Sequence, residues 1–113
     1  MNIQSGNIGT QHFEEKQIIA AGHPVMVITW PVKPDNGVYE MGQLLGLDDG
    51  EVVAYDQDIP LKGVCMRKVD TAVEAAADII VHGTVVKAAL TVLGAPIDND
   101  DILALHDITV YPI

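Results

Sequence analysis

The chain has 113 residues, a length that accommodates one domain and excludes two independent ones. Sixteen acidic residues against six basic ones give a formal net charge of −10, which repels nucleic-acid phosphates and anionic lipid headgroups. We therefore expect neither nucleic acid nor a membrane as a partner. Hydrophobic residues make up 49% of the chain and charged residues 19%, which is more apolar surface than a small monomer hides easily. We expect a homo-oligomer.

Cys65 is the only cysteine, so the chain forms no intrachain disulfide and no cysteine-rich metal site. No apolar run approaches the ~20 residues that a membrane span requires. The N-terminus shows no basic leader followed by an apolar stretch, which argues against a signal peptide. We expect synthesis in a reducing, aqueous compartment.

The first residues place isolated isoleucines among amides and glycines, a pattern that supports neither a helical stripe nor a core. We expect residues 1–17 to form a flexible arm and residues 18–113 to form a single domain. A frayed terminus is the simpler interpretation of this arm. The functional alternative is an extended strand that adds to the sheet edge of a partner, with Ile3, Ile8 and Phe13 as anchors.

Short strands separated by turn residues dominate the rest of the chain. Residues 25–30 predict an edge strand because prolines bracket them. Asp35-Asn36-Gly37 predicts a turn, and the runs 38–46 and 51–55 predict a hairpin around Asp48-Asp49-Gly50. Another strand is expected within residues 59–69. Residues 71–77 are ambiguous, since three consecutive alanines favour a helix but a loop of that length fits equally well.

Residues 78–86 predict the central strand, in which Gly83 marks a bulge or the close approach of another backbone. Residues 87–90 predict one helical turn. Asp98 and the acids after it predict a helix over residues 100–106, with Ile102, Leu103 and Leu105 covering the sheet. Residues 108–111 predict a closing strand. The expected fold is mainly β, of the β-rich α+β kind: a compact small β-barrel or β-tulip-like domain with one short C-terminal helix.

No pattern in the sequence carries obvious catalytic chemistry. The four histidines are scattered without metal-ligand spacing, and no phosphate-binding loop is present. Cys65 and His82 form the one nucleophile and base pair worth considering, although a buried cysteine and a structural histidine are the simpler interpretations. The paired carboxylates at 48–49 and 100–101 have structural explanations in a turn and a helix start. We expect no enzyme activity, no cofactor and no metal.

Taken in order, several segments resemble the small head decoration (capsid cementing) proteins of tailed bacteriophages, the lambda decoration protein D family. The resemblance spans residues 38–113, and its weight lies in the order of the segments and the total size. The matching pieces are the polar N-terminal arm, Gly42-Gln43-Leu44-Leu45-Gly46, the strand 51–55, Lys62-Gly63-Val64-Cys65-Met66, Val69-Asp70-Thr71, Ile80-Val81-His82-Gly83 with Val85 and Leu90, the short helix near 102–105, and Ile108-Thr109-Val110.

The resemblance implies a structural virion protein, made in the host cytoplasm and located on the outer capsid surface. It implies a homotrimer that sits on threefold sites of the expanded capsid, binds the major capsid protein and stabilises the shell against internal DNA pressure. A small β-barrel ligand-binding or carrier domain without catalysis is the alternative, since residues 38–55 also resemble a biotinyl-type hairpin. That hairpin lacks the turn lysine which such domains modify. An enzyme built on Cys65 and His82 is a distant third possibility.

Overall fold

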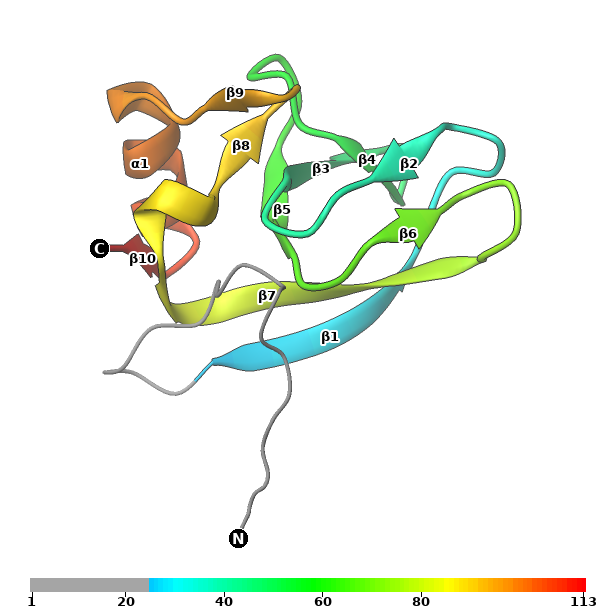
Figure 1. The fold of residues 1–113 in the computed structure, drawn as a ribbon, viewed down its shortest axis with the longest axis horizontal. Coiled ribbons are helices and arrows are strands. Elements are labelled where there is room, and N and C mark those ends of the chain that lie inside the picture. Colours follow the sequence, from blue (N-terminus) through cyan, green and yellow to red (C-terminus); the bar gives the residue numbers. More distant parts are fainter. Residues whose placement is uncertain (1–24) are drawn as a thin grey trace, which may run out of the picture.

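The computed structural model describes residues 25–113, which fold around a six-stranded sheet with one α-helix (Figure 1). Its strands follow the order β1-β7-β5-β3-β4, and β10 also pairs with β7. The bounds are β1 (Met26–Pro31), β3 (Leu44–Asp48), β4 (Glu51–Ala54), β5 (Leu61–Cys65), β7 (Ala76–Val85) and β10 (Val110–Pro112). Two small ladders pair β2 (Val38–Tyr39) with β6 (Val69–Asp70), and β8 (Thr91–Val92) with β9 (Ala95–Pro96). The helical segments are η1 (Lys87–Ala89) and α1 (Asn99–Asp107).

Both faces of the sheet are buried, which explains the uninterrupted apolar runs in the sequence. Successive side chains of a strand point to opposite faces, so Ile79 and Ile80 of β7 enter different core clusters. One cluster contains Leu44, Val64 and Ile80 together with Leu105 from α1. The other contains Leu45, Cys65 and Ile79 together with Tyr39 and Val69 from the β2–β6 ladder.

Two local signals predicted their elements correctly. The β3–β4 hairpin turns at Asp49 and Gly50, which both have positive φ and suit a tight hairpin. Helix α1 begins with a capping box, in which the Asp98 carboxylate accepts from the Asp101 backbone and the Asp101 carboxylate accepts from the Asp98 backbone. The mainly β class with one α-helix is confirmed for the described residues.

The expected barrel does not close. Beyond the main strand path, β1 and β4 meet through one isolated bridge, Val32 with Val52, and one backbone hydrogen bond from Lys33 to Val52. Pro31 and Pro34 flank this contact and have no N–H to donate, so the ladder cannot extend along β4. The described domain is a strongly curved open sheet (Figure 1).

Long-range pairing moved several predicted boundaries. The expected strand over 38–46 is split into β2 and β3 by a turn at Gly42, where φ is +87°. The ambiguous stretch 71–77 forms a turn that leads into β7 at Ala76. The closing strand begins at Val110, since Thr109 has a φ of +65° and cannot continue an extended ladder.

Gly83 has a φ of +118° and lies where β7 changes partners. Along β7, residues 76–82 pair antiparallel with β1, and residues 83–85 pair parallel with β10. The Gly83 N–H donates to the carbonyl of Thr109, the residue immediately before β10. The long strand β7 therefore pairs with both the first and the last strand of the described residues (Figure 1).

Candidate functional site

The proposed arm anchors Ile3, Ile8 and Phe13 lie outside the described residues. Their part in binding therefore stays a prediction. The described residues form a body that begins with β1. A functional site within it requires either reactive side chains without a structural role or exposed apolar surface.

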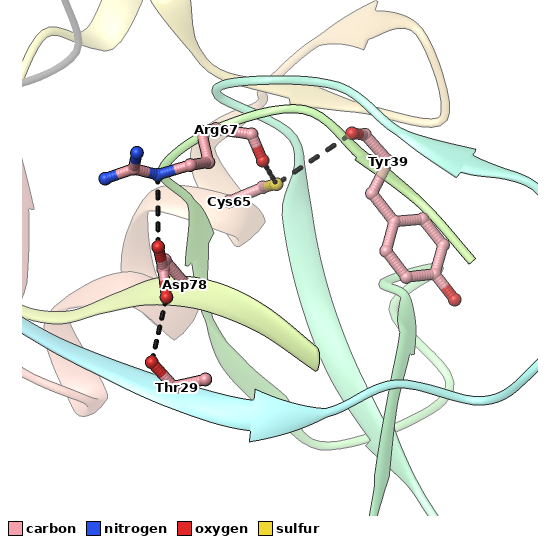
Figure 2. A network of polar contacts seen from close by, with 5 residues as sticks. All are labelled: Thr29, Tyr39, Cys65, Arg67 and Asp78. Atoms are coloured by element: carbon pink, nitrogen blue, oxygen red, sulfur yellow. Dashed lines mark hydrogen bonds and ion pairs between the residues drawn. The ribbon is translucent and has the colours of Figure 1, made fainter. Parts of the chain in front are cut away.

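Cys65 is fully buried and serves packing, as the simpler interpretation predicted. Its thiol donates to the Arg67 carbonyl at 3.0 Å, and the Tyr39 carbonyl lies 4.0 Å from the sulfur (Figure 2). Burial raises the pKa of the Cys65 thiol to about 11. At neutral pH the group is a protonated thiol rather than a nucleophilic thiolate.

The structure does not bring Cys65 and His82 together as a dyad. Cys65 lies opposite Ile79 in the β5–β7 ladder and shares a core cluster with it. His82 is three residues further along β7, at the register shift in the β1–β7 ladder. There its Nδ1 lies 2.8 Å from the Thr109 hydroxyl. The Thr109 hydroxyl itself donates to the Ile108 carbonyl, so Nδ1 acts as the donor in its pair with Thr109.

A polar network beside Cys65 fastens β1, β7 and the end of β5 to one another (Figure 2). The Thr29 hydroxyl donates to one oxygen of the Asp78 carboxylate at 2.8 Å, and Arg67 Nε contacts the other oxygen at 3.0 Å. Both carboxylate oxygens are therefore engaged within the protein. Asp78 thereby links Thr29 of β1 to Arg67 after β5.

Two aromatic side chains of the described range, Tyr39 and Trp30, make hydrogen bonds within the fold. Tyr39 is buried and its hydroxyl donates to the Val52 carbonyl while it accepts from the Asn36 amide. Trp30 is half-buried, donates from Nε1 to the Gly50 carbonyl at 2.9 Å, and carries the Lys62 ammonium 4.0 Å from its ring centroid. Tyr39 and Trp30 therefore form no exposed aromatic patch: Tyr39 is buried in the core and Trp30 is half-buried on β1.

The carboxylate pairs have the structural roles that the sequence indicated. Asp48 ends β3 and lies 3.8 Å from Lys33. Asp101 is buried beneath the start of α1, where its carboxylate completes the capping box and accepts from the Gln57 amide at 2.7 Å. Hydrogen bonding, first from the Asp101 backbone, lowers the pKa of Asp98. Within residues 25–113 no group of three His, Cys, Asp or Glu side chains is placed to hold a metal ion.

Several large apolar side chains are exposed to solvent and have no role in the contacts described so far. They occur on separate elements of the described body, and Leu103 is among them although it was expected to cover the sheet. Helix α1 instead buries Leu105 and leaves Leu103 facing outward, because a single short helix turns only one stripe to the core. The exposed large hydrophobic residues are Met26, Val27, Val38, Val73, Leu93, Leu103 and Ile113.

Two apolar hollows accompany these residues. One, of about 390 Å³, lies beside η1 and the base of the β8–β9 hairpin. The other, of about 410 Å³, lies between the 31–34 segment and the turn at 71–75 and includes Glu51 and Glu74.

Comparison with known proteins found no family model that matches the chain and no curated protein that matches it. Among the described residues no helix is long and apolar enough to cross a membrane.

Proposed function

We propose that this protein is a structural virion protein that binds as a homotrimer to threefold sites of an expanded phage capsid. In this role it attaches to the major capsid protein on the outer surface and stabilises the shell against the pressure of packaged DNA. Residues 1–17 supply the attachment, and Ile3, Ile8 and Phe13 are its anchors.

The observation that carries the proposal is the ordered series of glycine-punctuated strands over residues 38–113, which resembles head decoration proteins. The mainly β body with one short helix near the C-terminus is compatible with it. Exposed apolar side chains on several elements favour protein contacts. The net charge of −10 keeps such a protein away from the genome.

The proposed mechanism is attachment at three points of one rigid body. Each attachment is weak alone, but the second and third occur at the high effective concentration that linkage creates. Because the trimer binds only the expanded lattice, its binding free energy adds to the stability of that lattice by mass action.

Deletion of residues 1–11 tests this proposal. We expect the truncated protein to keep its fold and oligomeric state by circular dichroism and sedimentation, and to lose attachment to expanded capsids in a co-sedimentation assay. The triple variant Ile3→Ser, Ile8→Ser, Phe13→Ser provides a full-length control that removes the anchors and keeps the chain length. Retained attachment by both proteins would contradict the proposed mechanism.

A further inference from the structure

The β8–β9 hairpin exposes a leucine at a place where leucine is unfavourable. Its two-residue loop, Leu93-Gly94, connects the paired residues Val92 and Ala95, and φ is +51° at Leu93 and +85° at Gly94. Loops with two positive φ values favour Asn, Asp or Gly at the first position, since a side chain with a Cβ is strained there. The Leu93 side chain is also 65% exposed, so packing within the subunit does not compensate for the strain.

An apolar groove lies at the other end of the same hairpin. It has a volume of about 390 Å³, and Ile113 at its border is 68% exposed. One lining residue, Lys87, is charged. The lining residues are Lys87, Ala88, Leu90, Pro96, Ile97 and Ile113.

A subunit cannot fill this groove with its own Leu93. The leucine lies at the tip of the hairpin, whereas Leu90, Pro96 and Ile97 lie at its base beside η1 (Figure 1). Leu93 and the groove therefore lie at opposite ends of the hairpin. A second copy of the chain, displaced by one subunit, can bring the two together.

Charge favours a second copy at this surface. Two copies with a net charge of −10 repel each other, and the repulsion is least where no acid is present. Residues 91–97 and the lining of the groove contain no acidic residue. Lys87, the one charged side chain of the lining, is basic and adds no repulsion between two acidic copies.

We propose that Leu93 of one copy inserts into the apolar groove of the next, in a head-to-tail contact. Such a contact uses different surfaces on its two sides and forms a closed ring when the rotation between copies closes. The ring of three rests on the proposed function, whereas the contact itself rests on the hairpin and the groove. Insertion buries the apolar side chain of Leu93, and the strained loop holds that side chain in the position from which it contacts the next copy.

Sedimentation velocity of four proteins tests the contact: the wild type, Leu93→Asn, Ala88→Trp and the control Val73→Asn. The wild type is expected to be oligomeric. L93N should be a folded monomer, because Asn tolerates the left-handed conformation better than Leu. A88W should also be a monomer, because a bulky side chain at this exposed position blocks the groove. V73N removes a more exposed apolar residue, 80% exposed, from another loop and should stay oligomeric.

Mixing L93N with A88W makes the test specific for a head-to-tail contact. L93N keeps an intact groove and A88W keeps an intact Leu93, so the mixture should form a heterodimer through one joint although each variant alone is a monomer. A monomeric wild type, an oligomeric and folded L93N, or a mixture without heterodimer would each overturn the proposal.

Capsid co-sedimentation separates this inference from the proposed function. A wild-type oligomer that depends on Leu93 but does not attach to expanded capsids supports the contact and contradicts the function. Attachment of a wild type that sediments as a monomer supports capsid binding and overturns the contact.

Discussion

Cys65 lies between two backbone carbonyl oxygens and away from solvent, and this placement determines its chemistry. Cys65 lies opposite Ile79 in the β5–β7 ladder, whereas His82, further along β7, contacts Thr109. Burial disfavours the thiolate, which is the nucleophilic form. A residue type with reactive potential is therefore used here as a small apolar side chain.

The alkaline stability of the protein should report on this cysteine. Its pKa is raised from 9.0 to about 11, so between these values the unfolded chain has lost a proton that the folded chain retains. Stability from Cys65 is therefore complete below pH 9 and is lost as the pH rises toward 11. Over this range the wild type should lose about 2 kcal/mol more than Cys65→Ala in urea unfolding. Equal losses would contradict the assignment.

Iodoacetamide provides an independent check on the same residue. The folded protein should be alkylated slowly at neutral pH, and addition of denaturant should make the reaction fast. Mass spectrometry measures the modified fraction over time. Rapid and complete alkylation of the folded protein would revive the thiol-enzyme alternative.

At the scale of elements, β5 and β7 approach each other at Gly63 more closely than a side chain permits. A Cβ at this position would lie 2.3 Å from the backbone oxygen of Ile80 and 2.6 Å from a methyl carbon of Ile79. The backbone oxygen cannot move without disturbing the ladder in which Val64 pairs with Ile80. The absence of a side chain at this residue is thus a condition for the central pairing.

Gly63→Ala should therefore destabilise the fold by about 3 kcal/mol or more, the upper range for overpacking. The matched control is Gly37→Ala, because a Cβ there meets nothing within 4 Å and only its φ of +87° is unfavourable. The control should cost about 1–2 kcal/mol. Chemical denaturation of both variants measures the difference, and a Gly63→Ala protein as stable as the control would disprove the close approach.

At the scale of the whole molecule, a small sheet with two buried faces carries a large net charge and several exposed apolar side chains. Apolar burial favours self-association, and like charge opposes it. Salt weakens the repulsion between charged surfaces, with a screening length of about 8 Å at physiological ionic strength, and leaves apolar contact largely intact. The balance between the two forces is therefore adjustable by salt.

We expect the self-association of the wild type to become tighter as NaCl is raised from about 0.05 M to 0.5 M, because the Debye length falls over this range. Sedimentation equilibrium at both concentrations measures the change. An interface held mainly by ion pairs gives the opposite trend. Val73→Asn should follow the wild type, since it leaves the hairpin and the groove unchanged.

Features encoded by neighbouring residues were predictable from the sequence. The Asp49-Gly50 turn, the capped start of α1 and the burial of Cys65 follow from backbone preferences, capping and side-chain polarity, all of which act over a few residues. The mainly β class follows in the same way from the repeated short apolar runs. The attachment anchors in residues 1–17 remain a sequence prediction, because they lie outside the described residues.

Only the tertiary structure decided what depends on pairing between distant segments. The single bridge between Val32 and Val52 leaves the sheet open, and Cys65 lies opposite Ile79 while His82 contacts Thr109 just before β10. The exposure of Leu93 and the groove at the base of its hairpin were also invisible in the sequence. The physical reason is that strand partners and surface exposure are set by contacts between residues far apart in the chain, which local preferences do not specify.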